Sequence, residues 1–158
     1  MNERHQVPTV TLVEHVTIAI ALHEGYWKDG SVGQRNNNPG NLRWWGKERR
    51  RDGFVHFATP ADGFRALRLQ VWKNVVERRL TLFQFFAGGS SYPGYAPEAD
   101  GNDPVRYASV VRGQLSKYGL EVSDNQPLKT YASDGVAVGD LASYPGLGRL
   151  VPNLELSD

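Results

Sequence analysis

The sequence of 158 residues contains no cysteine. This absence excludes disulfide bonds, thiol catalysis and cysteine-ligated zinc. A chain of this length fits one domain and can bury about 68–70 % of the surface that its unfolded form exposes. We therefore expect the fold to depend on an ordinary hydrophobic core.

An excess of charge of either sign is also lacking. Lysines and arginines number 18 and acidic residues 17, which gives a formal net charge of +1. A net charge this small does not attract nucleic acid or an anionic membrane through the overall field of the protein. We expect no nucleic-acid partner, and any site for a polyanion would have to be local.

Long hydrophobic runs are missing as well. The apolar run near the start, VTIAIAL (16–22), is too short to span a bilayer. It also lacks the basic segment and the small-residue cleavage site of a signal peptide. We therefore expect no membrane span and no signal peptide.

Metal and cofactor motifs are absent from the sequence. Of the four histidines, only His23 is followed by a glutamate, and no second histidine lies four residues after Glu24. The chain has no glycine-rich phosphate loop and no G-x-S-x-G motif for a serine nucleophile. We expect neither a metal nor a cofactor.

Helix signals occur in four segments. Thr11 and Glu14 have the spacing of a capping box and predict a helix from Leu12 to about Glu24, apolar on nearly all sides and therefore buried. Three further helices are predicted by a threonine or aspartate N-cap and by apolar periodicity. They begin at Pro60, Leu82 (ending near residue 87) and Pro104 (ending before Gly119).

Two long polar and aromatic loops separate these helices. Residues 25–59 predict loops with a small hairpin whose best strand is 54–57, and residues 88–102 form the second loop. Loops of this length in a compact domain are usually functional. The sequence thus predicts a mainly α fold of the α+β kind, with residues 1–120 as the domain. Residues 121–158 are expected to pack on it or extend from it.

Glu24 is the first candidate for chemistry. A carboxyl group at the C-terminal end of an apolar helix lies at the negative end of the helix dipole, which disfavours its charged form. Neighbouring apolar side chains would act in the same direction. A carboxyl that keeps its proton near neutral pH is what a glycosidase needs to protonate a leaving oxygen. The alternative is a solvated glutamate, or one paired with an arginine such as Arg43.

The string RNNNPGNLR (35–43) is the second candidate. Asparagine amides suit the hydroxyl and acetamido groups of sugars, although the same residues also build tight turns. Aromatic residues flank the string and offer flat faces to pyranose rings, unless they belong to the core. They are Tyr26, Trp27, Trp44, Trp45, Tyr92 and Tyr95. Together the amides and rings predict a carbohydrate cleft.

A basic run, Lys47 to Arg51, follows the tryptophans. Such a run can bind a phosphate backbone or an anionic polymer of the cell wall. More often it is a solvated loop tip. The sequence leaves both interpretations open.

The string RNNNPGNLR, preceded by Glu24 and Gly25 and followed by FATPADGFRAL and YAPEADGNDPVRYASVV, resembles a known family. It is the family of phage and prophage muralytic proteins related to soluble lytic transglycosylases and goose-type lysozymes. The resemblance covers about residues 10–119. It implies a lysozyme-like fold, with helices around a glycan cleft, and peptidoglycan strands and other virion proteins as partners. It also implies a place in the virion, or in the host cytoplasm before release, and action in the periplasm and cell wall.

Residue by residue, the resemblance places the catalytic glutamate of the family on Glu24. The YAP element falls on residues 95–97, and one extra residue precedes the tyrosine that follows it. The resemblance implies substrate-binding roles for Asn37, Asn38, Asn41, Arg43, Tyr95, Asp100, Asn102 and Tyr107.

The implied reaction is cleavage of the β-1,4 bond between N-acetylmuramic acid and N-acetylglucosamine. Glu24 would protonate the glycosidic oxygen, and water or the 6-hydroxyl of the sugar would capture the oxocarbenium-like centre. Capture by the 6-hydroxyl needs no second carboxylate, and this favours a lytic transglycosylase over a muramidase. The alternative is a catalytically silent structural or glycan-binding module of a phage with the same fold.

Overall fold

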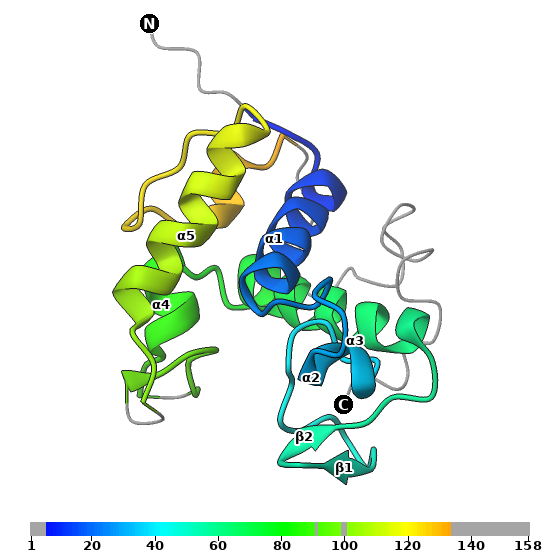
Figure 1. The fold of residues 1–158 in the computed structure, drawn as a ribbon. Coiled ribbons are helices and arrows are strands. Elements are labelled where there is room, and N and C mark those ends of the chain that lie inside the picture. Colours follow the sequence, from blue (N-terminus) through cyan, green and yellow to red (C-terminus); the bar gives the residue numbers. More distant parts are fainter. Residues whose placement is uncertain (1–5, 91, 99–100, 134–158) are drawn as a thin grey trace, which may run out of the picture.

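The computed structural model describes residues 6–90, 92–98 and 101–133. These residues form a mainly α fold with one two-stranded antiparallel sheet, as the sequence predicted (Figure 1). None of the helices in these ranges is long and apolar enough to cross a membrane. In chain order the elements are α1 (Thr9–His23), α2 (Val32–Arg35), β1 (Arg50–Arg51), β2 (Phe54–Val55), α3 (Pro60–Trp72), the π-helical turn η1 (Lys73–Glu77), α4 (Leu82–Ala87), α5 (Pro104–Lys117) and the 3₁₀ turn η3 (Leu128–Tyr131).

Helix α1 lies between α3 and α5 and is buried along most of its length (Figure 1). Leu12, Val16 and Ile20 are fully buried, as the nearly continuous apolar pattern predicted. The predicted capping box is wrong, because the helix begins at Thr9 with Pro8 at the N-cap position and no side-chain cap.

Glu14, the second residue of that predicted capping box, has another role. Its two carboxylate oxygens accept hydrogen bonds of 2.7 and 3.1 Å from Arg68 of α3. This ion pair joins α1 to α3 across 54 positions of sequence, so a local pattern could not reveal it.

The predicted caps of the later helices are confirmed. The Thr59 side chain accepts a hydrogen bond from the Asp62 amide and begins α3. Thr81 and Gln84 form a complete capping box at α4, and the Asp103 side chain caps α5. These helices begin where predicted because each signal is satisfied by a hydrogen bond within its own first turn.

The hairpin is shorter than predicted. Arg50 pairs with Val55 and Arg51 with Phe54, and residues 56–57 lie outside the strand. Asp52 and Gly53 connect the strands with φ values of 58° and 85°, as in a tight two-residue turn. The single turn α2 was not predicted, because four residues are too few for a periodic pattern.

Residues 121–133 pack on the helical core. Val122, Leu128 and Tyr131 are buried in the same cluster as α1, and the Leu128 amide donates to the Leu80 carbonyl. A parallel bridge joins Val7 to Ala132. The first part of the predicted extension therefore shares the core, and residues 134–158 lie outside the described ranges.

Candidate functional site

Glu24 forms the C-cap of α1, and Gly25 turns the chain away from the helix with a φ of 76°. The Glu24 side chain is half-buried. Its Oε1 accepts a hydrogen bond of 2.9 Å from Nδ2 of Asn41, and its Oε2 accepts one of 2.7 Å from the hydroxyl of Tyr107. The carboxylate is therefore held by two side chains, one from the asparagine loop and one from α5.

Both groups that hold the Glu24 carboxylate are uncharged. Within the described part of the chain no cationic side chain pairs with it, so the predicted alternative of a pair with Arg43 does not occur. His23 packs edge-on against the ring of Tyr107, with 4.2 Å between the ring centroids. The described hydrogen-bond partners of Glu24 are thus one amide and one phenol hydroxyl.

Two tyrosine hydroxyls lie near this carboxylate. Burial raises the pKa of Tyr95 well above its usual range, and the charge of Glu24 adds to the shift. Burial also raises the pKa of Tyr107, and Tyr95 and Glu24 add to it. Both hydroxyls therefore keep their protons and act as donors, Tyr107 to Glu24 and Tyr95 to the carbonyl of Gly40.

Asn38 holds the asparagine loop together. Its side chain is fully buried, and its Nδ2 donates to the carbonyls of Leu42 and Val55, both at 2.9 Å. Its Oδ1 accepts from the Leu42 amide, also at 2.9 Å. These bonds join the loop to β2, and they leave the amide no surface on which to contact a substrate.

The two preceding asparagines are also used within the loop. The Asn36 side chain is buried, and its Oδ1 accepts a hydrogen bond from Nε of Arg51 at 3.0 Å. The Asn37 Nδ2 donates to the Phe57 carbonyl at 2.9 Å. Thus the side chains of Asn36, Asn37 and Asn38 bind other parts of the loop and hairpin, and Asn41 alone of the four asparagines binds Glu24.

The backbone between the buried asparagines and Asn41 is closely packed. A Cβ on Gly40 would lie 2.2 Å from the Tyr95 hydroxyl and 2.7 Å from Cδ1 of Leu67, so a larger residue here would force these side chains to move. Asn41 follows with a left-handed φ of 49°. The loop thereby turns the Asn41 amide toward Glu24.

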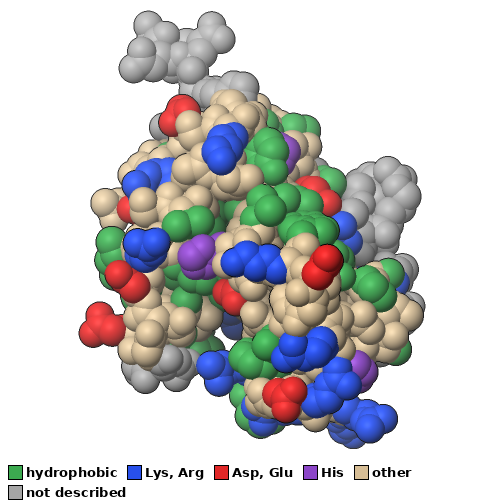
Figure 2. Space-filling model, in the orientation of Figure 1, with side chains coloured by type: hydrophobic (Ala, Val, Ile, Leu, Met, Phe, Trp, Pro, Cys, Tyr) green, Lys and Arg blue, Asp and Glu red, His purple; other side chains and the backbone are tan. Residues whose placement is uncertain are grey.

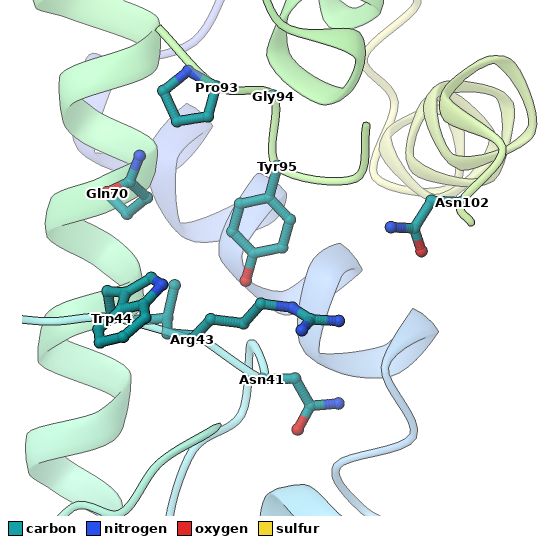
Figure 3. Close-up of a pocket in the computed structure, with 9 residues that line it drawn as sticks. Asn41, Arg43, Trp44, Gln70, Pro93, Gly94, Tyr95 and Asn102 are labelled. Carbon is teal, nitrogen blue, oxygen red and sulfur yellow. The ribbon is translucent and has the colours of Figure 1, made fainter. Parts of the chain in front are cut away.

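A pocket of about 430 Å³ is bordered by Asn41 (Figure 3). This volume falls in the usual range of ligand sites, about 300–1,000 Å³. The lining residues come from the asparagine loop, from α3 and from the segment after α4: Asn41, Leu42, Arg43, Trp44, Gln70, Pro93, Gly94, Tyr95 and Asn102.

The pocket and the carboxylate are neighbours. Glu24 does not line the pocket, but Asn41 both lines the pocket and binds Glu24. Tyr95 also lines the pocket, and it lies close enough to Glu24 for the charge of that residue to raise its pKa. The molecular face in Figure 2 is notched between the side formed by α4 and α5 and the side formed by α2 and the hairpin. The arrangement suits an extended ligand, with one part in the pocket and the next toward Glu24.

The predicted site residues divide into three groups. Asn41 and Tyr107 contact Glu24, and the pocket lining includes Asn41, Arg43, Tyr95 and Asn102. Asn37 and Asn38 face the interior of the loop instead. Asp100 lies outside the described residues.

The sequence left open whether the adjacent tryptophans form a platform or belong to the core. Trp44 is 69 % exposed and lines the pocket, whereas Trp45 is half-buried and packs against the core. Gln70, another lining residue, was not singled out from the sequence. It lies on α3, three residues after the buried Leu67.

Part of the basic run is used by the hairpin itself. Arg51 donates to the Arg35 carbonyl as well as to Asn36, and the Arg50 guanidinium lies 3.6 Å from the centroid of the Trp44 ring. Figure 2 shows Lys and Arg side chains gathered over this end of the molecule. In the described ranges no three His, Asp or Glu side chains group as metal ligands would.

Comparison with protein-family models, with curated proteins and with solved structures found no match for this chain. A function for this chain is therefore inferred from the geometry around Glu24 and from the sequence string that surrounds it.

Proposed function

We propose that this chain is a lysozyme-like enzyme that cleaves the β-1,4 bond between N-acetylmuramic acid and N-acetylglucosamine in peptidoglycan, with Glu24 as the general acid and base. One observation carries the proposal. A carboxylate at the end of a buried helix is held by two uncharged donors, beside an open pocket lined by amides, an arginine and aromatic rings.

The hydrogen bonds support the acid role through positioning. Asn41 and Tyr107 approach different oxygens of Glu24, so the carboxyl plane cannot rotate freely. A general acid must lie within hydrogen-bond reach of the oxygen it protonates, and a fixed carboxyl plane meets this need without an entropy cost at the moment of reaction. After the bond breaks, the same group takes a proton from the incoming nucleophile.

The surroundings of Glu24 favour the lytic transglycosylase route. Neither the described partners of Glu24 nor the lining of the pocket includes a second carboxylate. Hydrolysis with inversion or through a covalent intermediate uses two carboxyl groups, whereas capture by the 6-hydroxyl of the sugar uses one. The expected product therefore carries an anhydro-sugar end, lighter by one water than the hydrolytic product.

The experiment compares wild type, Glu24→Gln and Glu48→Gln on purified peptidoglycan, with mass analysis of the soluble fragments. Glu48 is an exposed loop residue, so its variant makes the same chemical change away from the site. Wild type and Glu48→Gln should release fragments with anhydro ends, and Glu24→Gln should release none above background. Equal release by Glu24→Gln would reject the assignment.

A second candidate is a glycan-binding or structural module that does not catalyse. The observation in its favour is that both oxygens of Glu24 already accept a hydrogen bond, as in a carboxylate with a purely structural role. Such a module would sediment with peptidoglycan while anhydro and reducing ends stay at background in wild type. The same fragment analysis therefore separates the two functions.

A further inference from the structure

The pocket beside Asn41 contains a cation, Arg43, that has no anionic partner among the described residues. The Arg43 side chain is exposed, and among the described residues its guanidinium has neither a hydrogen bond nor an ion pair. It lies 5.3 Å from the centroid of the Phe54 ring. By contrast, the guanidinium of Arg68 binds Glu14, and that of Arg51 binds Asn36 and a carbonyl.

The lining of the pocket gives this arginine no internal counter-charge. The nine lining residues include no aspartate or glutamate, and Arg43 is their one charged member. In Figure 3 its side chain extends along the pocket between the labelled Tyr95 and Asn41. A guanidinium presents parallel N–H groups that match the two oxygens of a carboxylate, so the pocket is suited to an anionic group of that shape.

An aromatic ring stands next to the arginine. One face of Trp44 is covered by the Arg50 guanidinium, which also donates to the Gly53 carbonyl at 2.9 Å. The indole is nevertheless 69 % exposed and borders the pocket. A ring that is backed on one face and open elsewhere offers an apolar surface to the flat side of a sugar.

Amide groups complete the lining. Gln70 comes from α3 and Asn102 from the segment before α5, and they lie on different sides of Tyr95 in Figure 3. Side-chain amides donate and accept hydrogen bonds, so they suit hydroxyl and acetamido groups. The pocket therefore combines one guanidinium with one exposed aromatic ring and three side-chain amides, those of Asn41, Gln70 and Asn102.

We infer that this pocket binds a sugar that carries its own carboxylate, with the carboxylate on Arg43 and the ring against Trp44. This inference deepens the proposed function and rests on it for the identity of the polymer. In a peptidoglycan strand the sugar of this kind is N-acetylmuramic acid whose lactyl carboxylate is not joined to a peptide. The preferred substrate is then a glycan strand from which the peptides have been removed.

A carboxylate could also come from a peptide attached to the strand, and the ligands of the test separate the two sources. They are peptide-free glycan fragments, the same fragments with peptides attached, and chito-oligosaccharides of equal length, which have no carboxylate. Dissociation constants are measured by calorimetry with the Glu24→Gln chain, which removes cleavage. All ratios are compared among variants that share this change, because it also removes a negative charge near the pocket.

The Glu24→Gln chain should bind peptide-free fragments about 10-fold or more tightly than chito-oligosaccharides, as expected for a charge-assisted pair. Adding Arg43→Gln should reduce this ratio toward one and leave chito-oligosaccharide binding nearly unchanged. Adding Trp44→Ala should weaken both ligands by a similar factor. Arg49→Gln is the matched control, because it removes the same charge from an exposed position outside the lining.

Three results would overturn the inference. One is equal binding of peptide-free fragments and chito-oligosaccharides, and another is an Arg49→Gln effect as large as that of Arg43→Gln. The third is equal or tighter binding of peptide-bearing fragments, which would assign the carboxylate to the peptide. If wild type cleaves no glycan while the preference through Arg43 remains, the proposed function fails and the binding site stands. If the binding preference through Arg43 is absent while wild type still cleaves peptidoglycan, the reverse holds.

Discussion

The two halves of the asparagine string use the same side chain in opposite ways. Asn36 and Asn38 are buried and bind the hairpin, whereas Asn41 is partly exposed and binds the Glu24 carboxylate. The buried half, Asn36 and Asn38, fixes the loop. Asn41, in the other half, binds Glu24 and lines the pocket. One asparagine-rich string thus contains both residues that support the site and a residue of the site.

The largest expected effect is on the stability provided by the buried half. Asn38→Ala would leave the Val55 carbonyl and the Leu42 amide without partners, and the Leu42 carbonyl would keep only its bond from the Val55 amide. The free energy of unfolding should fall by about 3 kcal/mol or more, measured by urea denaturation. The matched control is Asn125→Ala, an exposed asparagine, which should change stability by about 0.5 kcal/mol or less. Equal free energies of unfolding for the two variants would show that the Asn38 side chain does not stabilise the loop.

Replacing Asn41 should reduce the cleavage rate more than the stability, the reverse of what we expect for Asn38. Asn41→Gly removes the amide that binds Glu24, and it keeps a residue that tolerates the left-handed φ of 49°. Cleavage of peptidoglycan should slow by about 10- to 100-fold, the range for a hydrogen bond to a charged group, with a loss of stability smaller than that of Asn38→Ala. A variant that unfolds more easily but cleaves at the wild-type rate would show that Asn41 belongs to the support.

Removing the Tyr107 hydroxyl tests whether the second hydrogen-bond donor to Glu24 also contributes to cleavage. Tyr107→Phe removes the hydroxyl that binds Glu24 and keeps the ring, which is stacked on Phe86 with 4.3 Å between centroids. The cleavage rate should fall by about 10-fold, again the lower end for a hydrogen bond to a charge. Because the pKa of Tyr107 is raised, ionisation of this hydroxyl should not reduce wild-type activity at pH 10 or below. An alkaline loss of activity in wild type that disappears in the variant would contradict this.

The smallest expected effect is that of Trp44→Ala on stability. Trp44 is largely exposed, so its removal should change the free energy of unfolding by about 0.5 kcal/mol or less. Trp45→Ala should cost more than this, since Trp45 packs against the core. Thermal unfolding of the two variants side by side measures the difference. A reversed order would show that Trp44 supports the loop.

Much of the fold was predictable from the sequence because its signals act locally. The caps at Thr59, Thr81 and Asp103 are each satisfied within a few residues, and these helices begin where predicted. The predicted start of α1 was wrong. Thr11 and Glu14 match the local pattern of a capping box, but the side-chain partner of Glu14 is Arg68, 54 positions away on α3.

The sequence allowed the types of residue at the site to be predicted, but not which of these residues contact one another. Glu24 and Asn41 were singled out by position and chemistry, but their hydrogen bond spans 17 positions and that of Tyr107 spans 83. Nothing in the string itself separates Asn38 from Asn41, because burial depends on where β2 and α3 pack. For the same reason the adjacent residues Trp44 and Trp45 could not be told apart before the fold was known.

The most direct test of the central claim is the rate at which glycan strands are cleaved by wild type, Glu24→Gln, Asn41→Gly and the double variant. If Glu24 is the acid and base and Asn41 acts through it, Glu24→Gln should be slower than wild type by about 100- to 10,000-fold. The double variant should then be no slower than Glu24→Gln alone. A wild-type cleavage rate in Glu24→Gln would show that Glu24 is not the general acid and base.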